Sequence, residues 1–190
     1  MTFILNSTND NQPETSEPSG AAQNEPPINV FLIRPFEASD AQAVWGILQP
    51  MIRAGETYAL PRNLSRGASL SYWLAKGNEV FVAESDSVVV GTYFLRANQR
   101  GGGSHVANCG YATAPSFFGH GMATSMCADS LERARRRGFE AMQFNFVVST
   151  NTRAIAIWKR NGFAVVGCIP HAFLHPVVGL TDVYVMYRAL

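Results

Sequence analysis

The sequence contains few cysteines, little net charge and no long apolar run. Its three cysteines, Cys109, Cys127 and Cys168, are an odd number without Cys-x-x-Cys spacing. This argues against a disulfide framework or a zinc site, so we expect all three to be small core residues in a reducing compartment. The formal net charge of +1 gives no overall attraction to nucleic acid or to an anionic membrane surface, and we expect neither partner.

The N-terminal region lacks the features of a targeting segment and of a folded one. The opening "MTFIL" has no basic flank, and its apolar run is far shorter than a span of about 20 residues, so we expect a cytoplasmic protein. Residues 6–27 include four prolines, no aromatic residue and no aliphatic residue larger than alanine. Such a segment cannot offset its ordering entropy by burial, which predicts a disordered tail over residues 1–27.

One domain is predicted over residues 28–190, where strand and helix patterns alternate. The sequence "SDAQ" at Ser39 to Gln42 is a capping box that opens the first helix. Further helices are predicted at about 65–77, 122–137 and 150–163, and strands at about 28–35, 79–84, 87–98, 105–113, 141–148, 164–169 and 181–188. This order predicts an α/β fold with a mixed sheet of about seven strands and helices on both faces.

Two local patterns give more specific expectations. In "AMQFNFVV", strict alternation places Met142, Phe144, Phe146 and Val148 on one face of a strand. The segment "PHAFLHPVVGL", residues 170–180, is expected to be a long loop between the last two strands.

A glycine-rich turn stands before the third helix, in "FFGHGMA". The small residues Gly119, Gly121 and Ala123 let the backbone approach a ligand closely, and the helix start directs unpaired N–H groups at an anion. The expected guest is a phosphate or pyrophosphate, although such a turn is often only a tight connection. A Walker A loop would need Gly-Lys-Ser/Thr, and a Rossmann fingerprint would stand near the start of its domain, whereas four strands precede this turn.

Two sequence blocks resemble the GCN5-related N-acetyltransferase (GNAT) family. The segment from Phe118 to Ala123 is similar to the family's Arg/Gln-x-x-Gly-x-Gly/Ala signature, and it departs from it at Phe118. A second block of the family, Asn-x-x-Ala-x-x-hydrophobic-Tyr-x-x-x-Gly-Phe, is matched at Asn151, Ala154, Ile157, Trp158, Gly162 and Phe163. The opening "LIRPFEASDA" is also similar to the family, so the resemblance covers roughly residues 29–190.

The resemblance implies a mostly antiparallel sheet and an acetyl-CoA-dependent N-acetyltransferase without a metal. The amine would attack the thioester directly in a ternary complex, and backbone N–H groups near Thr113 would stabilise the developing oxyanion. Many relatives are dimers, so a homodimer is possible. The implied cofactor-binding residues are Ala112, Thr113, Ala114, Phe118, Gly119, His120, Gly121, Met122, Ala123, Thr124, Asn151 and Trp158. Because indole cannot replace the tyrosine acid of many relatives, Trp158 is expected either beside the cofactor or in the core.

The acceptor site departs from the family pattern. Many relatives use a glutamate on the fourth strand, but "HVANCGYAT" has no carboxylate. Asn108 there and Asn145 on the next strand could hold an acceptor while water carries the proton, or could instead satisfy neighbouring backbone groups. This pair resembles the branch of fungal proline-analogue (L-azetidine-2-carboxylate) N-acetyltransferases. Glu56 and Tyr58 lie where the family builds its acceptor pocket.

Three functions stay open at this stage. A small-molecule amine acceptor, such as an amino acid or a toxic analogue, is the favoured substrate, and a protein N-terminus is the second substrate class. A non-catalytic acyl-CoA-binding module is the third possibility, because the acidic base is missing. The only basic run, residues 132–137, falls in the last turns of a helix, where a solvated face is favoured over a nucleic-acid patch.

Overall fold

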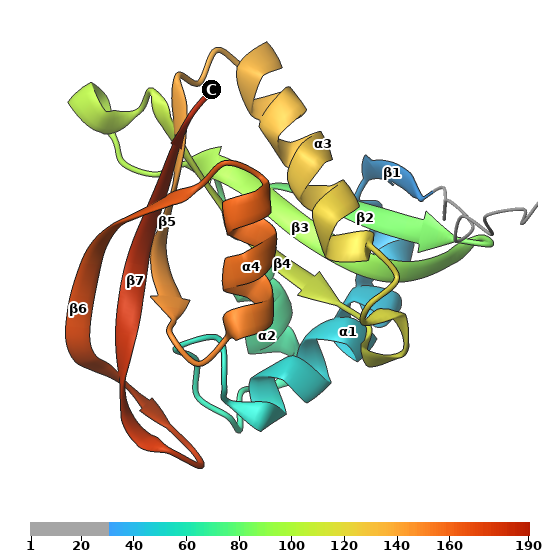
Figure 1. Ribbon diagram of the computed structural model, residues 1–190. Helices are drawn as coiled ribbons and strands as arrows, with labels where there is room; N and C mark the ends of the chain where they lie inside the picture. Colours follow the sequence, from blue (N-terminus) through green and yellow to red (C-terminus); the bar gives the residue numbers. More distant parts are fainter. Residues whose placement is uncertain (1–30) are drawn as a thin grey trace, which may run out of the picture.

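A seven-stranded sheet runs through residues 31–190, the part of the chain that the computed structural model describes (Figure 1). The strands are β1 (Leu32–Pro35), β2 (Glu79–Ser85), β3 (Val88–Ala97), β4 (Val106–Thr113), β5 (Ala141–Val148), β6 (Ala164–His175) and β7 (Gly179–Ala189). Their spatial order is β1-β2-β3-β4-β5-β7-β6. All neighbouring pairs are antiparallel except β4 and β5. The predicted fold class is confirmed, and the predicted tail lies outside the described residues.

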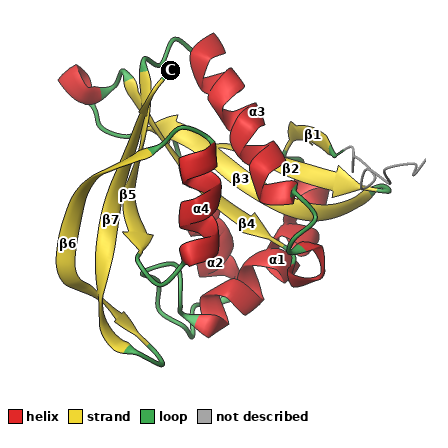
Figure 2. Cartoon of the chain, in the orientation of Figure 1, coloured by secondary structure: helices red, strands yellow, loops and turns green. Residues whose placement is uncertain are grey.

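Helices cover both faces of this sheet (Figure 2). They are α1 (Ala41–Ala54), α2 (Arg66–Trp73), α3 (Met122–Arg136) and α4 (Thr152–Arg160). On the α1/α2 face, Trp73 packs edge to face on Phe94, with ring centroids 5.0 Å apart. On the α3/α4 face, Tyr93 and Leu95 of the same strand join the larger core cluster. Alternate residues of β3 therefore face the two helical layers, as a pleated strand requires.

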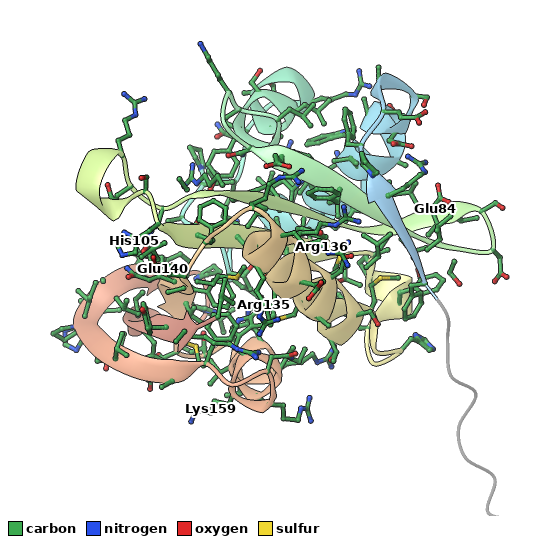
Figure 3. All side chains as sticks on the ribbon, turned by 90° about the horizontal axis from the view of Figure 1, so that it is seen from above. Glu84, His105, Arg135, Arg136, Glu140 and Lys159 are labelled. Carbon is green, nitrogen blue, oxygen red and sulfur yellow. The ribbon has the colours of Figure 1, made fainter. Side chains whose placement is uncertain are left out.

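Strands β4 and β5 separate soon after they begin. Their pairing consists of Val106 with Ala141 and Ala107 with Met142. Figure 3 shows His105 and Glu140 side by side at this point, where the Glu140 N–H donates to the His105 carbonyl at 2.9 Å. Because parallel strands stay together only through continued backbone pairing, its early end leaves a gap between their later halves.

A bulge in β5 overturns the predicted alternation of that strand. Between Phe144 and Val147 the register against β7 shifts by one residue. Val147 therefore joins Phe144 in the α3/α4 core, while Phe146 is 38% exposed and Val148 belongs to another cluster. The expectation of one continuous face was wrong because a bulge inserts an extra residue and reverses the later side chains.

The C-terminal strands form a long ribbon where a loop was expected. Strand β6 continues to His175 and β7 begins at Gly179, so only a short turn joins them. The expected loop was wrong because a bulge between Ile169 and Phe173 hides the strand alternation. His171 in this bulge has a left-handed φ of 54°, and its N–H donates to the Asp182 carboxylate at 3.0 Å.

The ribbon also corrects one expectation about the cysteines. Cys109 and Cys127 are buried, and burial raises the pKa of both thiols to about 12. Cys168 on β6 is exposed, because β6 is an edge strand with few contacts beyond β7. The ribbon exposes several further apolar side chains, namely Val165, Val166, Ile169, Leu174, Val177, Val178 and Leu180.

The basic run at the end of α3 is neutralised by carboxylates. Arg133 pairs with Asp129 at 2.7 Å, and Arg137 pairs with Glu79 at 2.6 Å. Arg135 and Arg136, labelled in Figure 3, both lie within 4.0 Å of Glu132. No helix within residues 31–190 is long and apolar enough to cross a membrane.

An ion-pair network joins the first strand to the first helix. Arg34 of β1 binds both carboxylate oxygens of Asp40, at 2.7 and 2.9 Å, and also contacts Glu84. Asp40 accepts the Glu37 N–H in a capping box at Glu37 and Asp40. The box predicted at Ser39 was wrong: it begins two residues earlier, at Glu37, because the Glu37 amide and Arg34 both bind the Asp40 carboxylate.

We predict that Asp40→Asn weakens this junction in a pH-dependent way. The hydrogen bonds from Arg34 lower the pKa of Asp40, so its charge stabilises the fold above about pH 4 and loses that effect as pH falls through the lowered pKa. At neutral pH the variant should lose about 1–3 kcal/mol of unfolding free energy, measured by urea denaturation. The difference from wild type should shrink in acid.

The matched control is Asp86→Asn in the exposed turn between β2 and β3. It removes the same charge without an ion pair and should leave the unfolding free energy nearly unchanged. Equal effects of the two substitutions, or an Asp40→Asn effect independent of pH, would contradict the assignment.

Candidate functional site

The gap between β4 and β5 is lined by backbone groups of β4. Asn98 N–H donates to the Val106 carbonyl and Ala114 N–H to the Val90 carbonyl, both at 2.8 Å. In an antiparallel ladder, hydrogen-bonded and non-bonded pairs alternate. Because Val106 and Ala114 bond to β3, all even-numbered residues of β4 direct their backbone N–H and C=O groups to β3. The N–H groups of Cys109, Tyr111 and Thr113 therefore point toward the gap.

This alternation selects among the predicted oxyanion donors. The Ala114 N–H is already used by Val90, and the Ala112 N–H faces β3 in the bonded pair with Thr92. Both were predicted as cofactor-binding backbone groups, and their N–H groups are directed elsewhere. The Thr113 N–H points toward the gap, as the predicted oxyanion donor must.

Asn108 lies where the backbone pairing of β4 and β5 ends. Its side-chain Nδ2 donates to the Gln143 carbonyl of β5 at 2.8 Å. The Asn108 side chain thus gives the Gln143 carbonyl the hydrogen bond that a backbone N–H of β4 would give if the two strands stayed paired. Asn108 is only 7% exposed, and within residues 31–190 its Oδ1 has no hydrogen-bond partner. One half of the Asn108 carboxamide therefore satisfies a neighbouring backbone group, and the other half makes no hydrogen bond within the described residues.

Asn145 belongs to a chain of carboxamides on the same side of the sheet. Its Oδ1 accepts from the Gln143 side chain at 2.7 Å, and its Nδ2 donates to Asn98 at 2.6 Å. The structure thus connects Asn108 and Asn145 through Gln143, although they do not bond directly. Sequence reasoning missed Asn98 and Gln143, even though the strand alternation placed Gln143 on the same face as Asn145.

Tyr58 reaches the gap from the loop after α1. Its hydroxyl donates to the Tyr111 carbonyl at 3.1 Å. Gly110 makes this approach possible, because a Cβ there would lie 2.9 Å from that hydroxyl and 2.5 Å from the Phe94 ring. Burial raises the pKa of Tyr58, so the phenol stays protonated and acts as a donor. Glu56 is exposed and makes no hydrogen bond within the described residues.

The glycine turn leads into the N-terminus of α3 beside the gap. Gly119 and Gly121 have left-handed φ values of 89° and 83°, and a Cβ on either would meet no atom within 4 Å. Their backbone conformation, rather than crowding, therefore requires glycine. The first intrahelical bond runs from Ser125 N–H to the Gly121 carbonyl. The N–H groups of Met122, Ala123 and Thr124 consequently have no intrahelical partner.

The N-terminus of α4 lies near the same turn. Asn151 caps this helix, with its Oδ1 accepting the Ala154 N–H at 3.2 Å. The Arg153 guanidinium stands 5.4 Å from the centre of the Phe118 ring, so α4 contacts the turn before α3. His120, also in the turn, is exposed. Two helix N-termini and the missed cation Arg153 together favour an anion here.

Trp158 packs in an aromatic cluster behind the gap. Its ring lies 4.8 Å from that of Tyr111 and 5.1 Å from that of Phe144, and only 8% of it is exposed. The Tyr111 hydroxyl is itself bonded to Ser130 at 2.7 Å. Met122, another predicted cofactor residue, has a fully buried side chain, so only its backbone is available. The core reading of Trp158 has direct structural support.

The arrangement can bind an anion at the glycine turn and stabilise negative charge in the gap. Strands β4 and β5 contain no Asp or Glu, and residues 31–190 hold no group of three or more His, Cys, Asp or Glu side chains placed to bind a metal ion. The available chemistry therefore comes from backbone N–H groups, carboxamides and the two helix N-termini.

Comparisons with known proteins point to one family. The Acetyltransferase (GNAT) family model matches residues 48–163. N-acetyltransferase aca1 of Schizosaccharomyces pombe is 32% identical over 98 residues, which are 51% of this chain and 47% of that relative. The match thus spans about half the length of that curated relative.

Solved structures share the whole described fold. A GCN5-related N-acetyltransferase from Kribbella flavida is 36% identical, with a TM-score of 0.80 over 84% of this chain and 98% of its own. The protein yncA from Salmonella typhimurium, solved with acetyl-CoA, has a TM-score of 0.75 at 21% identity and covers 85% of this chain and 94% of its own. The chain therefore belongs to the GNAT family of acetyltransferases, as its two sequence blocks predicted.

Proposed function

We propose that this protein is an acetyl-CoA-dependent N-acetyltransferase that acts on the amine of a small molecule, such as an amino acid or a toxic analogue. The observation that carries the proposal is the row of N–H groups on Tyr111 and Thr113, which face a gap beside the unpaired N–H groups at the start of α3. An acetyl donor and its phosphates need these two features at opposite ends of one site.

The cofactor side of the proposed site lies on the α3/α4 face. The residues from Gly119 to Thr124 supply backbone N–H groups for the pyrophosphate, and Arg153 adds positive charge. Two GNAT relatives, from Salmonella typhimurium and Sinorhizobium meliloti, have been solved with acetyl-CoA, which supports the same ligand here. The Tyr111 N–H points the same way as that of Thr113 and lies nearer to Asn108, because Thr113 is five residues, or about 16 Å, along the strand. We propose that the Tyr111 N–H donates to the thioester oxygen as negative charge develops on it.

The acceptor side would work without an acidic base on the strands. The amine nitrogen forms a bond to the acetyl carbon, the carbon–sulfur bond breaks, and the sulfur leaves as the CoA thiol. Asn108 Oδ1 can accept an N–H of the amine, while water carries the surplus proton away. Tyr58 stays a phenol and would hold β4 in place, through its hydrogen bond to the Tyr111 carbonyl, rather than take this proton.

The free Oδ1 of buried Asn108 favours an enzyme over a non-catalytic acyl-CoA-binding module, because it leaves an unused acceptor beside the proposed acetyl position. Residues 170–180, which as a loop could have closed a groove against a protein N-terminus, form a strand ribbon instead. The ribbon therefore does not itself exclude a protein acceptor, and the acceptor assay distinguishes the two substrate classes. The cytoplasmic location stays a prediction.

The first test measures release of CoA thiol from acetyl-CoA by purified protein. We expect turnover with amino acids or cyclic imino acids, and little with polyamines, aminoglycosides or short peptides. Turnover confined to peptides would favour a protein N-terminus as the acceptor. Acetyl-CoA binding without turnover on any amine would support the binding module instead.

A second test places a negative charge at the start of α3. Thr124→Glu should stabilise the helix by about 0.3–1 kcal/mol, because a carboxylate suits the positive end of the dipole. The same charge should weaken acetyl-CoA binding at least about tenfold, or about 1.4 kcal/mol, by repelling phosphate. Calorimetry measures the binding and thermal unfolding the stability.

The control for this test is Thr124→Gln, which has a similar size and no charge, and should bind acetyl-CoA nearly as wild type does. Opposite signs in stability and binding distinguish a blocked anion site from a damaged helix. Unchanged binding in Thr124→Glu would remove this turn from the cofactor site.

We also propose that two copies associate through the β6–β7 ribbon. Val166, Leu174 and Val177 there are 60%, 73% and 79% exposed. Asp182 and Arg188 are the only Asp, Glu, Lys or Arg residues in 161–190, and both already bond within the ribbon region. A two-fold contact brings a patch against its own copy, so a patch almost free of charge suits it.

Light scattering tests this association. Val166→Glu should turn a wild-type dimer into a monomer, because it would bring two carboxylates into an apolar contact. Val88→Glu, on a similarly exposed valine at the start of β3, should leave the dimer intact. A monomeric wild type, or equal dissociation in both variants, would refute the proposal.

A further inference from the structure

Arg96 lies beside the acceptor side of the gap and was not singled out by the sequence. In the β3–β4 register it stands directly opposite Asn108. Directly opposed residues project from the same face of a sheet, with Cβ atoms about 4.5–5.5 Å apart. Both side chains therefore lie on the α1/α2 face, and the Arg96 guanidinium stands 5.4 Å from the centre of the Phe94 ring.

Arg96 carries a charge without a protein counterion. Within residues 31–190 it has no carboxylate within 4.0 Å, whereas every arginine of the 133–137 run does. The side chain is exposed, so a ligand can reach it. Its position near Tyr72 has an electrostatic effect: burial raises the pKa of Tyr72, and the Arg96 charge opposes that shift.

The neighbouring groups complement this charge. Asn108 donates its Nδ2 to the Gln143 carbonyl, so its Oδ1 remains as an acceptor. The other carboxamides, on Asn98, Gln143 and Asn145, are bonded to one another. Within the described residues, the side-chain carbonyl oxygens without a partner on this face are those of Asn108 and Gln143, and the one on Asn108 stands directly opposite the Arg96 cation. The ligand that fits both at once carries an anion and an amine a short distance apart.

We propose that Arg96 binds the α-carboxylate of the acceptor while Asn108 Oδ1 accepts an N–H of its amine, so that the substrate class is free α-amino or α-imino acids. An α-amino acid holds these two groups on one carbon, which matches two side chains on opposed residues. The inference rests on the proposed function, because it concerns the acceptor of that same site.

If Arg96 binds the carboxylate, the protein can distinguish acceptors that all carry an amine. A polyamine would bring only positive charge to Arg96, and a peptide N-terminus has an amide in place of the α-carboxylate. Both would leave the guanidinium without an anion, and the polyamine would be repelled by it. Selectivity thus depends on the carboxylate rather than on the amine, which all these acceptors share.

The experiment compares an amino acid with its α-carboxamide, which keeps the amine and removes the negative charge. Proline and prolinamide are the probes, and alanine and alaninamide are a second pair. Wild type, Arg96→Gln and Arg96→Lys are titrated with each probe by calorimetry after saturation with CoA. Thiol release gives kcat and KM for the same pairs. Arg100→Gln, in the exposed loop after β3, removes one charge nearby and serves as the control.

We expect wild type and Arg100→Gln to prefer at least one of the acids over its amide by about tenfold or more in binding and in kcat/KM. Arg96→Gln should lose this preference by weakening the acid alone, and Arg96→Lys should restore part of it. The KM for acetyl-CoA and the unfolding midpoint should be unchanged, which separates a lost contact from a damaged fold.

Several results would overturn the inference. These are equal binding of acid and amide by wild type, an equal loss on both in Arg96→Gln, or the same loss in Arg100→Gln. Failure of the proposed function has a different signature, in which acids bind through Arg96 but no acetyl group is transferred. Acetylation of amides and peptides without preference would leave the enzyme in place and refute the role of Arg96.

Discussion

The early end of the pairing between β4 and β5 is the constraint on which the site depends. If the two parallel strands stayed paired, their backbone groups would satisfy one another and no donor would face a ligand. The Asn108 side chain satisfies the Gln143 carbonyl where pairing stops, and the bulge after Phe144 turns β5 away. The separation is thus stabilised by specific contacts, and the free N–H of Thr113 is its consequence.

The gap connects two faces of the sheet that differ in chemistry. On one face, the glycine turn, two helix N-termini and Arg153 concentrate positive potential. On the other face, carboxamides and Arg96 surround the entrance, and Tyr58 is held against β4 by the small size of Gly110. Because each face suits one reactant, the donor and the acceptor can meet only through the gap, which fits direct transfer in a ternary complex.

Local sequence signals predicted the parts of this site that depend on local structure. The turn around Gly121 was recognisable because left-handed glycines before a helix are a property of neighbouring residues. Alternation along β5 placed Gln143 and Asn145 on one face of that strand. The role of Arg96 depends on its register against Asn108, and the position of Phe146 depends on a bulge. Both are set by pairing with other strands, which composition and spacing do not record.

The absence of a carboxylate at position 108 is consistent with a free Arg96. A glutamate or aspartate there would stand opposite the guanidinium on the same face, and the two would form an ion pair. That pair would neutralise the cation and repel an acceptor carboxylate. An asparagine keeps a carbonyl oxygen for the amine without adding charge. A chain that recognises its acceptor by the α-carboxylate would therefore give up the acidic base of many relatives and rely on water for the proton.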